Sequence, residues 1–236
     1  MAQQSRAQTG APPWPRDGLF ARLRAATAVE WRRFIDHEFV RRLGRGTLAE
    51  PSFKHYLGQD YRFLIHFARA WGLAVYKSEN LAEMRHANAA LRAILDVEMG
   101  LHVAFCAGWG MREADMEALP EADATTAYTR FVLDRGLAGD LLDLETALAP
   151  CIIGYAEIAQ TLKSDPATKS AGNPYRDWIE MYAGDEYRTV ARAAAEELDR
   201  LWHARAGGGR FDSLLKTFRQ ATLLEAAFWQ MGLDAG

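Results

Sequence analysis

The chain has 236 residues, of which 49% are hydrophobic, 25% charged and 11% aromatic, a composition typical of one globular domain. Its formal net charge of -3 gives no electrostatic reason to expect nucleic acid or an anionic membrane as a partner. The two cysteines are too few for a disulfide framework, and no apolar stretch is long enough to cross a bilayer. We therefore expect a protein of the reducing cytoplasm that does not bind nucleic acid or membranes.

Apolar residues recur three and four positions apart almost throughout the chain, and alternation with a period of two is nearly absent. This pattern predicts an all-α protein whose long helices form a bundle. Residues 1–18, which hold three prolines and no apolar run, are expected to form a flexible N-terminal tail, and residues 19–236 a single helical domain. The expected helices, in chain order, span 19–43, 51–77, 80–108, 112–118, 125–135, 140–162, 174–182, 185–204 and 211–232.

Two carboxylates fall on helix faces that otherwise carry apolar residues. Asp60 lies midway between Leu57 and Leu64 on the inward stripe of its helix, and Glu225 precedes Phe228 on the inward stripe of the last helix. Burying a carboxylate costs several kcal/mol unless it is paired. Each of the two is therefore either a structural hydrogen-bond acceptor or part of a functional site.

A cysteine occupies a similar inward position on the helix expected over 140–162. Pro150 directly precedes this residue, Cys151, and leaves the carbonyl of Thr146 without its helical partner, so a kink is expected beside the thiol. A buried cysteine is usually a small hydrophobe, but a thiol at a strained turn is a candidate nucleophile. Cys106, which has no such neighbour, is interpreted as packing.

Aromatic residues gather in the same segments as these three side chains. Aromatic residues at helical spacing more often belong to a core than to a binding site. A pocket that combines rings with two carboxylates and a thiol, however, suits a flat heteroaromatic ligand. We therefore favour a small planar substrate. The aromatic residues concerned are Tyr56, Tyr61, Phe63, Tyr128, Tyr155, Trp178, Tyr182, Phe228 and Trp229.

The sequence offers little for a metal or a cofactor. A helical bundle that binds two irons takes a Glu-x-x-His element from each of two helices. Only Glu83 and His86 fit this element, although Glu98 and His102 are spaced to share a helix face. No glycine-rich phosphate loop joins a strand to a helix. We expect no metal and no cofactor.

Six segments, in order along residues 19–233, resemble those of the thiaminase II (TenA) family. The resemblance implies an all-helical, haem-oxygenase-like fold that uses no haem, and a homotetramer. The segments are LGQDYRFL at 57–64, EMGLH at 98–102, AYT at 127–129, LAPCIIGYAEI at 148–158, NPYRDWIEMYAGDEY at 173–187 and EAAFWQM at 225–231.

The resemblance also implies an activity and a set of site residues. The activity is hydrolysis of 4-amino-5-aminomethyl-2-methylpyrimidine, or of thiamine, to 4-amino-5-hydroxymethyl-2-methylpyrimidine. Cys151 is implied as the nucleophile that adds to the ring, and Glu225 as general acid and base. The implied substrate-binding residues are Asp60, which would hold the exocyclic amine, with Phe63, Tyr128, Tyr155, Tyr182 and Phe228.

Two positions depart from the family pattern. Many members carry a tyrosine where this chain has Phe63, and many carry an aromatic residue where it has Ala226. Since no residue is evidently dedicated to the thiazolium of thiamine, we expect the aminomethylpyrimidine to be the better substrate. A non-catalytic pyrimidine-binding regulator and a metal-dependent oxidase on the same fold remain as alternatives.

Overall fold

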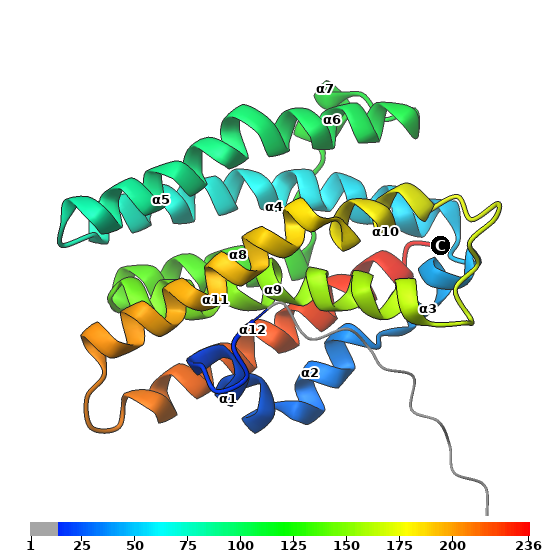
Figure 1. The fold of residues 1–236 in the computed structure, drawn as a ribbon. Helices are drawn as coiled ribbons and strands as arrows, with labels where there is room; N and C mark the ends of the chain where they lie inside the picture. The colour runs from blue at the N-terminus through cyan, green and yellow to red at the C-terminus, as the bar shows by residue number, and fades with distance from the viewer. Residues whose placement is uncertain (1–13) are drawn as a thin grey trace, which may run out of the picture.

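The computed structural model describes residues 14–236, and every regular element in that range is helical, which confirms the predicted all-α class (Figure 1). None of these helices combines the length and apolar character needed to span a membrane. The elements are α1 (Leu19–Ala26), α2 (Ala28–Ile35), α3 (Glu38–Arg45), α4 (Glu50–Lys77), α5 (Leu81–Ala93), the π-helical turn η1 (Ile94–Glu98), α6 (Met99–Gly108), α7 (Glu113–Ala118), α8 (Asp123–Ala138), α9 (Leu141–Ser164), α10 (Arg176–Ala183), α11 (Asp185–Arg205) and α12 (Arg210–Leu233).

The first predicted helix, over 19–43, is wrong, because the chain turns twice within it. Thr27 (φ -118°, ψ 30°) and Asp36 (φ -113°, ψ 35°) leave the helical conformation and separate α1, α2 and α3. His37 then caps α3, since its ring Nδ1 accepts a hydrogen bond from the backbone N–H of Phe39 at 3.2 Å. All three helices bury apolar residues in the same core, so the apolar period continues across both turns. Periodicity alone therefore indicated one helix where there are three.

The third predicted helix, over 80–108, begins where expected but is divided by η1. Asn80 caps its start, because its side-chain oxygen accepts hydrogen bonds from the backbone N–H groups of Ala82 and Glu83 at 3.1 and 3.0 Å. The other predicted helices are confirmed to within three residues at each end. α9 stays helical through Pro150.

Most of the expected N-terminal tail lies outside the described residues. Within the described part, Trp14 is buried, and its ring packs edge-on against Phe20 with 5.0 Å between centroids.

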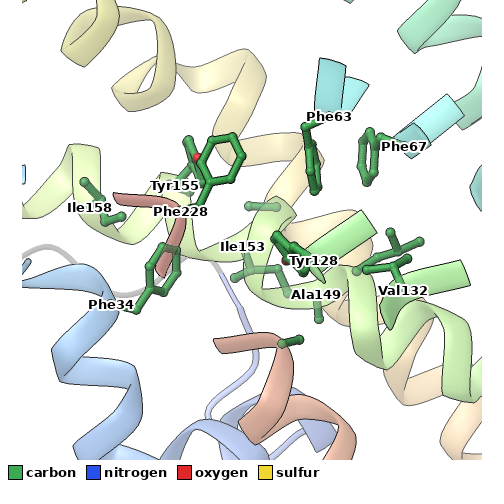
Figure 2. Close-up of a cluster of buried hydrophobic side chains, with 14 of the residues drawn as sticks. Phe34, Phe63, Phe67, Tyr128, Val132, Ala149, Ile153, Tyr155, Ile158 and Phe228 are labelled. Atoms are coloured by element: carbon green, nitrogen blue, oxygen red, sulfur yellow. The ribbon is translucent and has the colours of Figure 1, made fainter. Parts of the chain in front are cut away.

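The long helices α4, α9 and α12 form the centre of the bundle. α9 packs against α8, α10, α11 and α12, while α4 packs against α5, α8 and α12. In Figure 1, α5, α6 and α7 run along one side of this centre, and α1 and α2 lie on the opposite side. Figure 2 shows the buried cluster between the central helices, which includes Phe63, Tyr128, Tyr155 and Phe228. The predicted aromatic site residues therefore belong to a continuous core.

Candidate active site

A cavity of about 380 Å³ lies between α4, the α5–η1–α6 segment, α9, α10 and α11. This volume falls within the range of about 300–1,000 Å³ found for small-molecule pockets. Most of its wall is apolar or aromatic. The polar side chains that line it are Asp60, Glu98, His102, Cys151, Tyr155, Tyr182, Glu186 and Tyr187.

The predicted site residues come together around this cavity, in its wall or directly behind it. Asp60, Phe63, Cys151, Tyr155 and Tyr182 are in the wall. Tyr128, Glu225 and Phe228 are buried and do not line the cavity. The ring of Phe63 connects the two groups, since its centroid lies 5.1 Å from that of Tyr128 and 6.0 Å from that of Phe228 (Figure 2).

Glu225, on α12, is almost fully buried at 1% exposure. The hydroxyl of Tyr128 donates a hydrogen bond to its Oε1 at 2.8 Å. Burial raises the pKa of Glu225 to about 8, and the nearby charge of Asp60 also raises it. At neutral pH the Glu225 carboxyl is therefore mainly protonated and can donate a hydrogen bond or a proton.

The position of Tyr128 depends on a neighbouring amide that fixes the start of α8. Gln59 donates from Nε2 to the carbonyl of Pro120 at 3.0 Å. Its Oε1 accepts hydrogen bonds from the N–H of Ala122 at 2.9 Å and from the hydroxyl of Thr125 at 2.6 Å. These bonds tie the first turn of α8 to the middle of α4, so Tyr128 is held at a fixed depth in the bundle.

Asp60 is 9% exposed, and burial raises its pKa to about 7. The hydroxyl of Tyr56 hydrogen-bonds to it and in turn accepts from Nε1 of Trp178 at 3.3 Å. Nδ1 of His102 lies 3.6 Å from the Asp60 carboxylate, while its Nε2 donates to the carbonyl of Leu57 at 3.0 Å. Burial lowers the pKa of His102, so this ring is neutral and does not balance the charge of Asp60.

Cys151 is partly exposed to the cavity. Burial raises the pKa of its thiol well above the usual value, and the charges of Glu225, Asp60 and Glu98 raise it further. In the free protein this residue is therefore a thiol, and its ionisation needs a base or a positive charge brought by a ligand. Cys106 is fully buried and does not line the cavity, and burial raises its pKa to about 12.

Glu98 and His102 are cavity residues that the sequence prediction did not place in the site. In an α-helix, residues four apart drift around the axis by about 40° at each step. At η1 the N–H of Met99 bonds to the carbonyl of Ile94, five residues back, and this wider turn cancels part of the drift. Ala90, Ile94, Glu98 and His102 consequently all face the cavity. Their four-residue spacing was the available signal, but sequence reasoning weighed it only for metal binding.

Tyr56 was noted among the aromatic residues and also left outside the predicted site. It lies one helical turn before Asp60, and that spacing was the signal for its contact with the carboxylate.

A possible set of metal ligands lies outside the cavity wall, at His86, Glu145 and Glu197. One ligand atom from each lies within 4.8 Å of the others. Both oxygens of Glu197 already accept hydrogen bonds from Arg200. In the Glu-x-x-His element noted in the sequence, Glu83 and His86, both oxygens of Glu83 accept hydrogen bonds from Arg205.

Comparison with known proteins agrees with this architecture. The aminopyrimidine aminohydrolase of Halalkalibacterium halodurans is 35% identical over 206 residues, which are 86% of this chain and 90% of that protein. The crystal structure of a TenA family transcription regulator from Silicibacter sp. TM1040 has a TM-score of 0.87 and 44% identity, over 94% of this chain and 98% of that one. A heme oxygenase-like domain from Shewanella denitrificans has a TM-score of 0.71 at 14% identity, over 91% of this chain and 92% of that one.

These likenesses confirm the haem-oxygenase-like helical fold. Residues 24–235 match the TENA/THI-4/PQQC family as a whole, which covers the cavity and every predicted site residue. The chain therefore belongs to the TENA/THI-4/PQQC family.

Proposed function

We propose that the protein is an aminopyrimidine aminohydrolase of thiamine salvage. It would convert 4-amino-5-aminomethyl-2-methylpyrimidine and water to 4-amino-5-hydroxymethyl-2-methylpyrimidine and ammonia. The observation that carries this proposal is the cavity wall, in which a thiol, a buried carboxylate and aromatic rings surround a space suited to one flat ligand. The relative from Halalkalibacterium halodurans carries the name of this activity. The cytoplasmic location and the homotetramer stay predictions.

Recognition of the pyrimidine would use the carboxylate of Asp60 and the surrounding rings. Asp60 accepts a hydrogen bond from the exocyclic amine, and Phe63 and Tyr155 offer ring faces or edges to the heterocycle. Tyr182 packs against Tyr155 with 5.1 Å between centroids and so limits its movement. The ring is thereby oriented before any bond changes.

The chemistry would begin with Cys151. Its sulfur adds to an electron-poor ring carbon, while the protonated Glu225 supplies a proton to a ring nitrogen, a transfer that requires the bound ring to reach Glu225 behind the cavity wall. The electrons then return to expel the amine from the exocyclic carbon, and the thiol proton leaves with it as ammonia. Water adds to that carbon and leaves a hydroxyl there, Glu225 recovers its proton from the ring nitrogen, and elimination of the sulfur restores the aromatic product, with the proton released by the water returning to the Cys151 sulfur. Glu225 therefore acts first as an acid and then as a base.

Thiamine shares the pyrimidine half and would be the poorer substrate. Phe63 lacks a hydroxyl and Ala226 lacks a ring, so neither offers a contact dedicated to a thiazolium. We expect a higher kcat/KM for the aminomethylpyrimidine.

The test is turnover of both compounds by the purified protein, with the hydroxymethyl product measured by NMR, in the presence and absence of a chelator. Product formation at the same rate with and without the chelator supports the proposed hydrolase function. A protein that binds pyrimidines but turns over neither compound would be a binding protein instead. Loss of activity with the chelator would point to the metal-dependent alternative, and a kcat/KM for thiamine at or above that for the amine would overturn the substrate preference.

A further inference from the structure

The cavity contains negative groups that no positive side chain balances. Asp60, Glu98 and Glu186 line it, and among the described residues of its wall none is a lysine or an arginine. His102 is neutral because burial lowers its pKa. A ligand that enters this cavity is therefore favoured if it carries a positive charge.

Among these carboxylates, Glu98 is the one without a partner. Glu186 is exposed, so water solvates its charge, and the carboxylate of Asp60 has the hydroxyl of Tyr56 as a hydrogen-bond partner. Glu98 is half-buried, and its carboxylate has no hydrogen bond or ion pair with any described residue. Burial, followed by the charge of Asp60, raises its pKa to about 7. An unpaired carboxylate inside a cavity costs free energy that a cationic ligand can recover.

The exposure of Glu98 is intermediate between that of the buried and that of the exposed residues of the cavity wall. The deep end contains Asp60 and Tyr155, which are 9% and 5% exposed. The mouth is formed by apolar residues with large exposed fractions, 61% for Leu101 and 52% for Val190. In the pose expected from the proposed function, with the pyrimidine held by Asp60 and its departing group toward the exposed side of the cavity, that group would pass Glu98. The η1 turn is what brings this side chain to the cavity.

We infer that Glu98 binds the positive charge on the group that leaves the pyrimidine, an ammonium or a thiazolium, and so distinguishes the cationic substrate from the neutral alcohol product. This inference rests on the proposed function. A protonated amine is compact and can approach a carboxylate closely, whereas the charge of a thiazolium is spread over its ring. Discrimination by Glu98 is therefore greater for the aminomethyl compound than for thiamine.

The experiment compares substrate and product binding in a protein that does not consume the substrate. In Cys151→Ser protein at neutral pH, calorimetry gives the Kd of the aminomethylpyrimidine, of thiamine and of the hydroxymethylpyrimidine. Adding Glu98→Gln should weaken binding of the aminomethyl compound about 10-fold and that of the neutral alcohol less than about 2-fold. Glu98→Asp, which keeps the charge, should restore part of the difference.

The matched control is Asp96→Asn, which removes a charge from the same turn. Asp96 is exposed, pairs with Arg92 at 3.1 Å and does not line the cavity, so all three Kd values should stay unchanged. If Glu98→Gln weakened the binding of the substrate and of the alcohol equally, or weakened neither, the inference would be overturned. The proposed hydrolase function would not be affected by that result. If the Cys151→Ser protein bound none of the three compounds, the proposed function itself would fail.

Discussion

Two buried glutamates in this bundle have opposite acid–base behaviour. Glu83 is 2% exposed and Glu225 is 1% exposed, so burial alone does not distinguish them. Both oxygens of Glu83 accept hydrogen bonds from Arg205 at 2.8 Å, which lowers its pKa to about 2. Among the described residues, the Glu225 carboxyl has only the Tyr128 hydroxyl as a hydrogen-bond partner, and its pKa rises to about 8. The bond from Arg205 holds Glu83 in its charged form, whereas the stronger desolvation of Glu225, which has no cationic partner among the described residues, favours its neutral form.

The difference extends to the surroundings of each residue. Near Glu83, the half-exposed Arg200 of α11 pairs with both Glu83 and Glu197, so opposite charges from α5 and α11 meet there. Around the cavity, Asp60 and Glu98 have pKa values of about 7 and no cationic side chain beside them in the described structure. Charges that the fold itself does not balance are typical of sites where a ligand supplies the balance.

The largest expected effect tests whether the chemistry belongs to the cavity region. Cys151→Ser should lower hydrolysis by about 1,000-fold or more, because serine replaces the only thiol in the cavity wall of the described structure. Cys106→Ser should keep activity, since Cys106 is fully buried away from the cavity. Steady-state assays and circular dichroism of both variants decide the matter. Similar losses in the two proteins would show that the thiol of Cys151 has no special role.

A smaller effect, on stability instead of activity, is expected at Glu83, the glutamate that is paired with Arg205. Glu83→Gln leaves Arg205, whose side chain is 10% exposed, without its main partner and should cost about 3 kcal/mol of unfolding free energy. Urea denaturation measures this loss, and affinity for pyrimidines should not change. Asp96→Asn breaks an exposed pair with Arg92 and should cost under about 0.5 kcal/mol. A stability loss no larger than that of the control would contradict the pairing.

The third expected effect is a dependence of stability on pH that Glu225 causes and the charged Glu83 does not cause over the same pH range. Glu225 has a pKa of about 8 in the native state, against an ordinary value of 4.5. Between pH 4.5 and about 8, the native protein therefore keeps this proton while the unfolded protein has lost it. The stability that the protonated Glu225 contributes is complete below pH 4.5 and is lost as the pH rises through about 8. Between these values, wild-type stability should fall relative to Glu225→Gln by about 1.4 kcal/mol per pH unit. Parallel stability profiles for the two proteins would show that Glu225 is ionised in the native state.

Some of this site could be predicted from the sequence because it depends on regular helices. Asp60, Cys151 and Glu225 interrupt apolar stripes, and α4, α9 and α12 keep α-helical register at these positions, so the stripe gave the correct face. Glu98 lies in η1, where the register changes, and a constant period does not show which way it points. The turns at Thr27 and Asp36 escaped prediction for a related reason, since backbone conformation changed there while the burial pattern did not.

The π-helical turn makes the shape of the cavity depend on the number of residues in one wall as well as on their identity. Each residue of an α-helix adds about 100° of rotation. Inserting one residue between Glu98 and His102 in regular α-helix would turn His102 and Phe105 by about 100° away from the space that they now line, because only the wide turn of η1 takes up a residue without such a rotation. The insertion of a single codon just after η1 would thus remodel the cavity without substituting any side chain that lines it. For this family member, differences in helix length are a route to new specificity, separate from substitution.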